Sequence, residues 1–165
     1  MTLLRPLTPE DVDQVLGVYE DAVISQAVGL YEPRQIEAWA AHAQRSPALR
    51  TALLAGQGLV SCAAGDPARV EAFALLDPLD RLALLYCRGR SSRQGRASAL
   101  LTAVEELARA SGCRRLRTEA SQLSRPLLLR RGWQVEAEET VLYAGVPFLR
   151  WRMIRCLAPD PAADG

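Results

Sequence analysis

The segment from residue 81 to residue 112 constrains the fold of this chain more than any other part of the sequence. It begins with the short apolar run RLALLYC, which is typical of a buried strand, and continues into the arginine-rich stretch RGRSSRQGR. An apolar repeat with helical spacing follows and stops at Gly112, where a left-handed cap would end a helix. The order of strand, basic loop and helix predicts an α/β protein. The apolar positions of the predicted helix are Ala97, Leu100, Leu101, Val104, Leu107 and Ala108.

The start of this predicted helix has the properties of an anion-binding site. Its first backbone N–H groups have no partner within the helix, and the aligned peptide dipoles add partial positive charge there. Gly95 and Ala97 are small enough to let a phosphate approach the backbone of residues 94–98. The loop is therefore predicted to bind a diphosphate. The arginines expected to supply positive charge around it are Arg88, Arg90, Arg93 and Arg96.

Two familiar phosphate-binding loops do not fit these residues. The P-loop requires four residues between its glycines and a lysine after the second, whereas Gly89 and Gly95 enclose five residues and the chain contains no lysine. The dinucleotide fingerprint requires three spaced glycines near the start of a βαβ domain, and here only Gly95 is in place, in the middle of the chain. Neither motif explains the loop.

The stretch LYCRGRSSRQGRASALL resembles the acetyl-CoA loop of the GNAT superfamily of N-acetyltransferases. That loop reads Gln/Arg-x-x-Gly-x-Gly/Ala after a strand that often ends in Leu-Tyr-Val. Gly95 and Ala97 occupy the two small positions, while Ser92 stands where Gln or Arg is usual. The later stretch RLRTEASQLSRPLLLRRGWQVEAEETVLYAGVPFLRWRMIRCL is similar to the second half of a GNAT subgroup, and YEPRQIEAWA looks like that subgroup's Tyr-x-x-x-Gln-x-x-Ala-Trp. The resemblance extends from Leu3 to about Leu157.

This resemblance implies a GNAT-like α/β fold, with a mixed, mostly antiparallel sheet of about seven strands flanked by about four helices. We expect one domain over residues 1–157. Residues 158–165, which read APDPAADG, are expected to form a disordered tail. The implied function is direct transfer of an acetyl group from acetyl-CoA to an amine of a small molecule or a protein N-terminus. The alternative is a catalytically degenerate acyl-CoA-binding or interaction module on the same fold. A homodimer through the last hairpin is common in the family, so a homodimer is possible here.

The resemblance also implies the site residues. The end of the strand is expected to hold the pantetheine arm with its free backbone groups and to supply an oxyanion donor. Ser121 stands where many relatives have an Asn that anchors this arm. Tyr31 and Trp39 either belong to the core or line the acceptor pocket. The residues expected to bind acetyl-CoA are Leu85, Tyr86, Cys87, Arg88, Arg93, Gln94, Gly95, Arg96, Ala97, Ser98 and Ser121.

The catalytic acid and base are less clearly indicated. The commonest general acid in the superfamily is a Tyr at the position that Leu128 occupies here, and leucine cannot donate a proton. Tyr143, Tyr86 or water could serve instead, or the thiolate could leave unaided, since a thiol pKa near 8.5 makes it a fair leaving group. Glu119 is expected to act as the base through water; a structural ion pair with Arg117 or a neighbour explains it equally well.

Other reactive side chains have simpler interpretations. Cys87 has no histidine nearby in sequence, so a packed strand thiol is favoured over a nucleophile. The single histidine, His42, is interpreted as a surface residue on a helix. The four cysteines lie far apart without a C-x-x-C pair, so the sequence suggests reduced thiols and no metal site or disulfide framework.

Composition fits this interpretation. A chain of 165 residues with 49% apolar and 24% charged content is long enough for one domain with a proper core. All 20 basic residues are arginine, and residues 86–131 hold eleven of them against three glutamates, so this part is expected to face an anion. Nucleic acid is disfavoured because no predicted helix combines a basic face with aromatics. No apolar run approaches 18 residues and no signal peptide is recognised, so we expect a cytoplasmic protein without membrane partners.

The remaining elements follow from local patterns. Thr8 and Pro9 predict the start of a helix, and Pro33 the start of another. Turn compositions separate three short apolar runs, which read as an antiparallel meander. The predicted strands are residues 3–7, 59–63, 70–76, 81–87, 115–120, 134–143 and 147–157, the last two forming a hairpin around Gly145. Further helices are predicted from residue 33 to 42 and from 123 to 131, with a short helical turn within 47–55.

Overall fold

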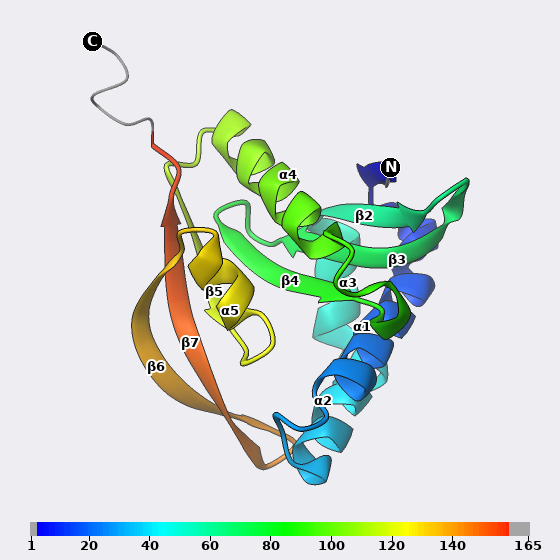
Figure 1. Cartoon of the computed structure of the whole chain (residues 1–165), viewed down its shortest axis with the longest axis vertical. Coiled ribbons are helices and arrows are strands. Elements are labelled where there is room, and N and C mark those ends of the chain that lie inside the picture. Colours follow the sequence, from blue (N-terminus) through cyan, green and yellow to red (C-terminus); the bar gives the residue numbers. More distant parts are fainter. Residues whose placement is uncertain (1–2, 159–165) are drawn as a thin grey trace.

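A computed structural model describes residues 3–158 of the chain, and Figure 1 shows the arrangement of its elements. The predicted tail therefore lies, apart from Ala158, outside the described residues. The strands are β1 (Leu3–Pro6), β2 (Gln57–Ala63), β3 (Asp66–Leu76), β4 (Arg81–Cys87), β5 (Arg115–Ala120), β6 (Gln134–Tyr143) and β7 (Val146–Cys156). The helices are α1 (Val12–Gln26), α2 (Pro33–Arg45), α3 (Pro47–Ala55), α4 (Arg96–Ala110) and α5 (Arg125–Arg130), with short 3-10 turns at Pro9–Asp11 and Gly89–Ser91.

The strands form one mixed sheet in the order β1-β2-β3-β4-β5-β7-β6. Every neighbouring pair is antiparallel except β4 and β5, which run parallel. The predicted fold class is thus confirmed. The structure has five α-helices within residues 3–158, one more than the resemblance implied, because the turn predicted within residues 47–55 is a full helix.

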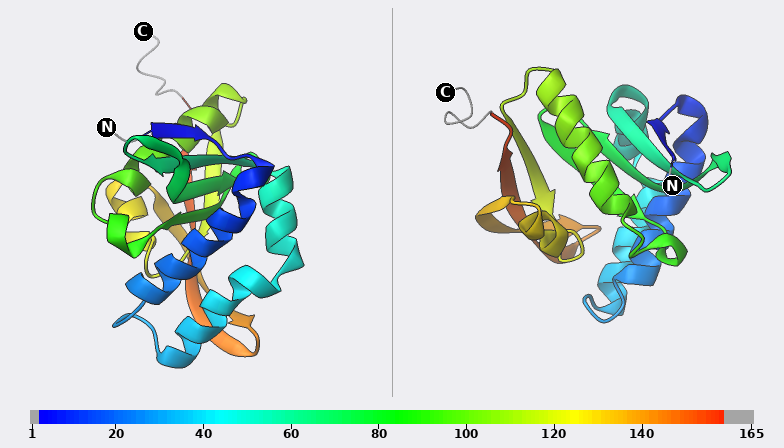
Figure 2. Two further views of the ribbon diagram at one scale, coloured as in Figure 1. Left: turned by 90° about the vertical axis from the view of Figure 1, so that its right-hand side faces the viewer. Right: turned by 45° about the horizontal axis from the view of Figure 1, so that its top comes forward.

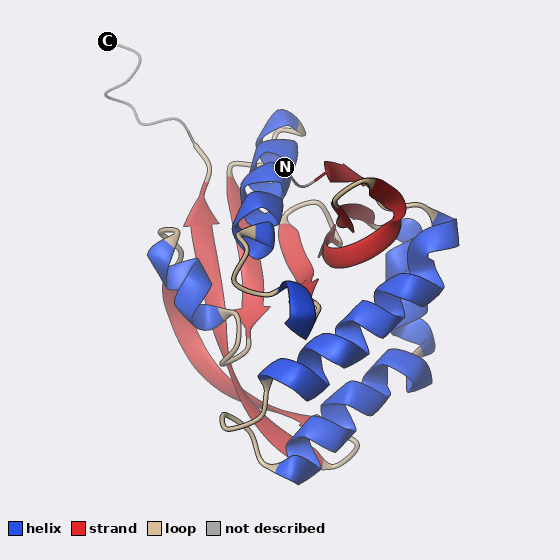
Figure 3. Cartoon of the chain, turned by 45° about the vertical axis from the view of Figure 1, so that its right-hand side comes forward, coloured by secondary structure: helices blue, strands red, loops and turns tan. Residues whose placement is uncertain are grey.

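Helices cover both faces of the sheet, and β3 shows why the sequence requires this. Phe73 and Leu75 point into the core beneath α1, α2 and α3, while Ala72, Ala74 and Leu76 point into the core beneath α4 and α5. All five side chains are buried, so this strand reads as a continuous apolar run instead of an alternating one. In Figure 1, α4 and α5 lie in front of the sheet, and Figure 2 shows the same layers from two other sides. Figure 3 shows α1 and α2 packed side by side.

Strand β3 begins earlier than predicted, for a physical reason. The hairpin turns at Gly65, whose φ of 75° suits a residue without a side chain, so pairing with β2 resumes at Asp66. Residues 66–69 are exposed and carry no apolar pattern that would mark them as a strand. No helix among the described residues is long and apolar enough to cross a membrane.

The sheet divides between its two parallel strands. Only two residue pairs join β4 to β5, Arg81 with Arg117 and Leu82 with Thr118. The hydroxyl of Thr118 donates to the carbonyl oxygen of Leu82 at 2.6 Å and closes the ladder there. Beyond this point β4 continues to Cys87 without a partner on that side, while β5 turns away with β7 (Figure 1). The divergence leaves backbone groups of β4 available to a bound molecule.

The start of α1 is fixed to the sheet by a half-buried ion pair. Arg5 donates from Nη1 and Nη2 to the two oxygens of Asp11 at 2.7 and 2.8 Å, and the Thr8 backbone N–H adds a third bond at 2.9 Å. The Arg5 side-chain hydrogen bond is the main reason that the pKa of Asp11 is lowered to about 2, against the opposing effect of burial. Ionised Asp11 therefore stabilises the folded state.

We expect Asp11→Asn to destabilise the protein by about 2 kcal/mol at neutral pH, the free-energy equivalent of the lowered pKa. Because the folded-state pKa lies below the unfolded one, this contribution is present above about pH 4 and disappears as the pH falls toward 2. Urea unfolding at several pH values measures it. Asp13→Asn is the matched control, since its pair with Arg50 leaves the Asp13 side chain 87% exposed. Equal losses in both variants would contradict the prediction.

Candidate active site

The divergence of β4 and β5 opens a cleft of about 140 Å³, which we call the split cleft. It is bordered by β4, β5, the end of α1, the start of α4, and α5 with the turn before it. Several residues predicted as site residues meet here although they are distant in sequence. The cleft is lined by residues 82–87 of β4 together with Ala22, Gln26, Ala97, Thr118, Glu119, Ser121, Leu123, Ser124, Leu127 and Leu128.

The N-terminus of α4 opens at this cleft. Gly95 caps the helix with a φ of 81°, a left-handed conformation that a residue with a Cβ adopts at a cost. The first intrahelical bond runs from the N–H of Ala99 to the carbonyl of Gly95, so the N–H groups of residues 96–98 have no partner within the helix. A Cβ built on Gly95 would meet nothing within 4 Å, which leaves the approach open. The backbone here fits an anionic group of a ligand.

One of the four predicted loop arginines has a different role. The Arg96 side chain is buried and donates from Nη1 to the Ser61 hydroxyl and the Cys62 carbonyl, both at 2.9 Å. Its charge therefore lies under the helix, against β2. The prediction that this guanidinium supplies charge to the loop is wrong, because the first turn of α4 packs on the sheet and directs the side chain inward. Only its backbone N–H remains available.

Arg88 and Arg90 are also engaged within the protein. Arg90 donates from Nε and Nη2 to the buried carboxylate of Glu71 at 3.1 and 2.9 Å, and the Ser91 hydroxyl bonds to the same group at 3.0 Å. Burial raises the pKa of Glu71, but these hydrogen bonds outweigh it and the pKa is lowered. Arg88 donates to the Val70 carbonyl at 3.2 Å. Both side chains are thus bonded to β3, although Arg90 is still 60% exposed, and Arg93 is exposed as well.

The sequence did not reveal what holds this loop. The Gly89 N–H donates to Asp21 of α1 at 2.9 Å, and a Cβ on Gly89 would collide with the Ser25 side chain. The loop is therefore pinned to α1 on one side and to Glu71 on the other. Glu71 is the single acid within the apolar run RVEAFALL, and buried carboxylates are usually paired. The sequence could therefore have predicted that Glu71 binds a basic side chain. Asp21 carried no comparable signal.

A second cavity, of about 340 Å³, is lined by α1, α2, α3 and strands β3 to β7, and we call it the aromatic pocket. Tyr31 and Trp39, for which the sequence left core and pocket open, both line it. Their rings lie 5.2 Å apart, and Trp39 donates from Nε1 to the Tyr86 hydroxyl at 3.2 Å. The ring-bearing residues of the lining are Tyr19, Tyr31, Trp39, His42, Tyr86, Tyr143 and Phe148, and its charged residues are Asp77, Arg81, Glu119 and Arg150.

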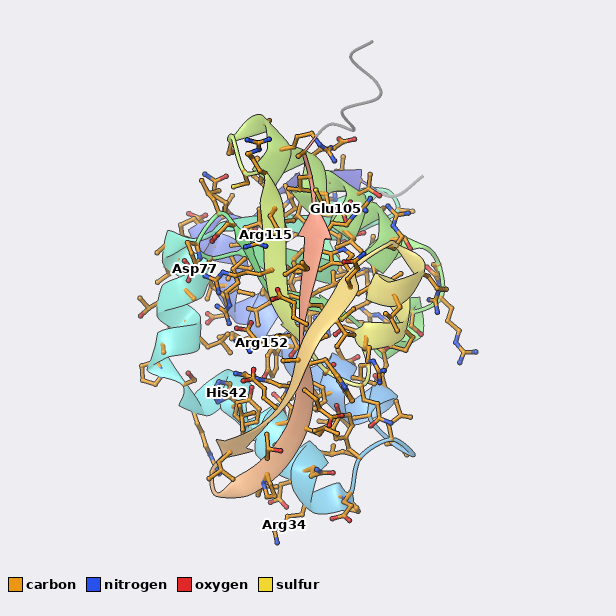
Figure 4. All side chains as sticks on the ribbon, turned by 90° about the vertical axis from the view of Figure 1, so that its left-hand side faces the viewer. Arg34, His42, Asp77, Glu105, Arg115 and Arg152 are labelled. Atoms are coloured by element: carbon orange, nitrogen blue, oxygen red, sulfur yellow. The ribbon has the colours of Figure 1, made fainter. Side chains whose placement is uncertain are left out.

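His42 is not the surface residue that the sequence suggested. It is half-buried in the aromatic pocket, with its ring 5.3 Å from that of Tyr143 and 6.5 Å from that of Tyr19. Burial lowers the pKa of His42, so the imidazole is neutral at neutral pH. The prediction was wrong because the β6–β7 hairpin covers the face of α2 that carries His42. The sequence of α2 alone, in which apolar and polar residues mix around His42, does not reveal this cover. Figure 4 shows His42 and Asp77 along the same flank of the molecule.

The split cleft and the aromatic pocket share five lining residues, Ala83, Leu84, Tyr86, Glu119 and Ser121. Glu119 forms an ion pair with Arg81, whose Nε lies 3.0 Å from its Oε2, whereas Arg117 faces Asp80 at 3.7 Å. The ion pair that the sequence allowed for Glu119 therefore exists, with a neighbour and not with Arg117. Its carboxylate still borders both cavities.

Ser121 and Cys87 have clear local roles. The Ser121 hydroxyl accepts bonds from the N–H groups of Leu123 and Ser124 at 3.1 and 3.3 Å, which shapes the turn between β5 and α5. Cys87 is buried, and burial raises the pKa of its thiol to about 11. This agrees with the predicted packed thiol. Within residues 3–158 all four cysteines are free, and no group of three or more His, Cys, Asp or Glu side chains could hold a metal ion.

A mixed sheet divided between two parallel strands, with a helix N-terminus at the division, is the architecture of the GNAT acetyltransferases. A GCN5-related N-acetyltransferase from Rhodopseudomonas palustris superimposes with a TM-score of 0.86 and 25% identity, over 94% of this chain and 96% of that one. PaiA N-acetyltransferase from Thermoplasma acidophilum, in complex with coenzyme A, gives a TM-score of 0.74 and 18% identity over 94% and 99% of the two chains. A phosphinothricin acetyltransferase from Sinorhizobium meliloti, in complex with AcCoA, gives a TM-score of 0.66 and 17% identity over 98% of this chain and 91% of that one.

No protein-family model matches the sequence, and no curated protein matches it either. The family resemblance read from the sequence is nevertheless confirmed at the level of structure, because the structural neighbours are GNAT acetyltransferases over almost their whole length. The protein has the fold of the GNAT acetyltransferases.

Proposed function

We propose that the protein is an N-acetyltransferase that moves an acetyl group from acetyl-CoA directly to an amine of a small molecule or a protein N-terminus. The observation that carries this proposal is the meeting of the split cleft and the aromatic pocket at Tyr86, Glu119 and Ser121. Two substrates can approach this point from different sides. The proposal is further supported by structural neighbours solved with coenzyme A or AcCoA.

In this proposal the split cleft takes acetyl-CoA. The N–H groups of residues 96–98 and the exposed Arg93 side chain bind the diphosphate, with Gln94, Gly95 and Ser98 around it. On the side away from β3, backbone groups of Leu85, Tyr86 and Cys87 pair with the pantetheine arm and supply an oxyanion donor; the Cys87 carbonyl is excepted, because it accepts a bond from Gln26 Nε2 at 2.5 Å. The thioester then lies near Glu119, where the aromatic pocket delivers the amine.

The chemistry requires one bond exchange and two proton movements. The amine nitrogen forms a bond to the acetyl carbon while the carbon–sulfur bond breaks. The amine loses a proton, for which Glu119 is the proposed acceptor, directly or through one water. The sulfur leaves as a thiolate and takes up a proton to give the free thiol of coenzyme A. Glu119 is well placed because its carboxylate borders both cavities, and Arg81 fixes its orientation.

Of the two tyrosines considered as proton donors, we favour Tyr86 over Tyr143. Tyr86 lines both cavities, whereas Tyr143 lines only the aromatic pocket. Burial raises the pKa of Tyr86, so its hydroxyl stays protonated across the working pH range. Leu128 lies in the wall of the split cleft, where it can only exclude water. In this proposal Tyr86 on β4, whose hydroxyl accepts a bond from Trp39 Nε1 at 3.2 Å, takes the place of the donor that the family usually has at position 128.

We expect Tyr86→Phe to lower kcat at least tenfold, with acetyl-CoA binding retained, because the leaving thiolate loses its proton donor. Tyr143→Phe should reduce kcat by less than about threefold, since its hydroxyl is not at the split cleft. Thiol release measured from pH 7 to 10 tests both variants. A full kcat in Tyr86→Phe would show that the thiolate leaves with water or unaided, and a larger loss in Tyr143→Phe would return the role to that residue.

Thermal and urea unfolding with ligand test the proposal as a whole. Acetyl-CoA at 100 times its dissociation constant should stabilise the protein by about 2.7 kcal/mol. S-acetylpantetheine, which lacks the diphosphate, should stabilise it far less at the same concentration. Absence of any effect of acetyl-CoA would refute the proposed function. Stabilisation without thiol release from a broad amine panel would instead identify an acyl-CoA-binding module.

A further inference from the structure

The aromatic pocket gathers an unusual share of the chain's rings. The chain has four tyrosines and one histidine, and all five line this one cavity, together with Trp39 and Phe148. Tyrosine hydroxyls need polar partners, so a packed core that only has to exclude water would favour other side chains. The concentration of phenol rings around a cavity of about 340 Å³ therefore points to a bound guest and not to simple core packing.

The rings come from α1, α2, β4, β6 and β7 and from the loop before α2. Tyr86 on β4 lies 4.4 Å from Tyr19 on α1, and Trp39 on α2 lies 6.1 Å from Phe148 on β7, measured between ring centroids. Phe148 in turn lies 5.1 Å from Tyr143 at an interplanar angle of 71°. Rings held by one another at steep angles form a pocket of fixed shape. Flat aromatic groups stack or meet edge to face with such rings.

The charges of the pocket balance. Its four charged side chains are two acids and two arginines, and both arginines already have acidic partners: Arg81 with Glu119 at 3.0 Å and Arg150 with Glu139 at 2.9 Å. The Arg81 Nη1 donates in addition to the Asp77 carbonyl at 3.2 Å. His42, the remaining titratable base, is half-buried. Both arginines of the lining are thus engaged with carboxylates, which leaves none free for a substrate carboxylate, and Asp77 is a single carboxylate and not the cluster that a polycation would require.

Aromatic rings adjoin the polar junction of the two cavities. Glu119 and Ser121 line both cavities, and beside them the Tyr31 hydroxyl accepts a bond from the Gln122 N–H at 2.8 Å. Trp39 donates from Nε1 to Tyr86, which also lines both cavities, at 3.2 Å, and the Phe148 ring lies 6.1 Å from that of Trp39. A guest whose amine reaches Glu119 would place the rest of its body among these rings. Because Tyr31 and Trp39 adjoin this junction, a linker of a few atoms is enough to place an aromatic group against them.

We propose that the acceptor is a small primary amine joined by a short chain to a flat, uncharged aromatic group. This inference rests on the proposed acetyltransferase function and names its acceptor class. Tyr31, Trp39 and Phe148 hold the aromatic group, and Glu119 faces the amine. The step is the acetyl transfer described above, with the acetamide of this amine and the free thiol of coenzyme A as products.

Four acceptors of similar size separate the possible classes. 2-Phenylethylamine is the expected type of substrate, and 2-cyclohexylethylamine has the same carbon skeleton without the aromatic ring. Phenylalanine adds a carboxylate, and 1,5-diaminopentane replaces the ring by a second cation. We expect kcat/KM for 2-phenylethylamine to exceed that for the cyclohexyl compound about tenfold, and those for the other two about 100-fold. Thiol release with saturating acetyl-CoA measures all four.

A pair of variants tests the ring assignment. Tyr31→Leu should raise KM for 2-phenylethylamine about tenfold and bring it close to the value for 2-cyclohexylethylamine, because the aromatic contact is lost. Tyr31→Phe keeps the ring and removes the hydroxyl that accepts a bond from the Gln122 N–H at 2.8 Å, so it should retain the preference. Stabilisation by acetyl-CoA should be unchanged in both, which also shows that they fold.

The outcomes distinguish this inference from the proposed function. If acetyl-CoA does not stabilise the wild-type protein, the proposed function fails and the acceptor class with it. If acetyl-CoA stabilises the protein but phenylalanine or 1,5-diaminopentane is the best acceptor, or 2-phenylethylamine does not react, only the acceptor class is overturned. An equal kcat/KM for the phenyl and cyclohexyl amines would likewise overturn it, because the pocket would then select bulk and not aromaticity.

Discussion

Ala97→Asp is expected to abolish acetyl-CoA binding without weakening the fold. Ala97 is the second residue of α4 and lines the split cleft, so a carboxylate there would stand among the N–H groups proposed to bind the diphosphate. Two like charges about 4 Å apart repel by about 4 kcal/mol at an effective dielectric of 20, so affinity should fall about 1,000-fold. An acidic residue in the first turn of a helix stabilises it by about 0.3–1 kcal/mol. Stability and binding should thus change in opposite directions.

Ala110→Asp provides the matched control at the other end of the same helix. This residue is exposed in the last turn, where a negative charge opposes the helix dipole and should cost a few tenths of a kcal/mol. Acetyl-CoA binding should stay at the wild-type level. Urea unfolding gives the stability of each variant, and isothermal titration gives its affinity. If the two variants bind acetyl-CoA equally well, the diphosphate does not lie at the start of α4.

Glu119→Gln should lower kcat about 100-fold or more while acetyl-CoA binding changes little. The amide keeps the shape of the side chain but cannot accept the amine proton, and a positioned base typically contributes a factor of about 100 to 10,000. The loss should shrink as the pH rises and more of the free amine is already deprotonated. Steady-state thiol release between pH 6 and 9.5 measures the effect.

Asp80→Asn controls for the loss of an ion pair between the same strands. Asp80 precedes β4 and faces Arg117 of β5 at 3.7 Å, much as Arg81 of β4 faces Glu119 of β5 at 3.0 Å. Its side chain is 53% exposed and lies outside both cavities, so kcat should stay within about twofold of the wild-type value. A small effect of Glu119→Gln, comparable to that of Asp80→Asn, would assign Glu119 a purely structural role.

The sequence predicted best where the structure depends on local rules. The bounds of β4, β5 and β6 agree with those predicted. β4 is a mostly apolar run and β5 alternates between buried and exposed residues, while the end of β6 is marked by the turn at Gly145. The start of α4 could also be predicted from the sequence, because Gly95 stands directly before an apolar repeat with helical spacing. The structure gives Gly95 a left-handed conformation and begins the helix at Arg96. These elements bring the predicted residues 85–87 and Ala97 into one cleft.

The errors concern side chains whose partners are distant in sequence. Arg90 and Arg96 were expected to face a ligand, but Glu71 and the Ser61 hydroxyl, 19 and 35 positions away, bind them instead. His42 was assigned to the surface because its cover comes from a hairpin about 100 residues further on, through Tyr143. The sequence does not show whether an arginine or a histidine side chain contacts water or a distant part of the chain. Only the folded structure identifies that partner.

The short ladder between β4 and β5, closed by Thr118, has a consequence for the kinetics of the reaction. The two cavities have largely separate linings and share only five residues, so in the proposed function acetyl-CoA and the amine are expected to be bound at the same time. Double-reciprocal plots at several fixed amine concentrations should then give intersecting lines. A parallel pattern would require an acetylated protein intermediate, which the buried Cys87 thiol, with its pKa of about 11, is poorly suited to form.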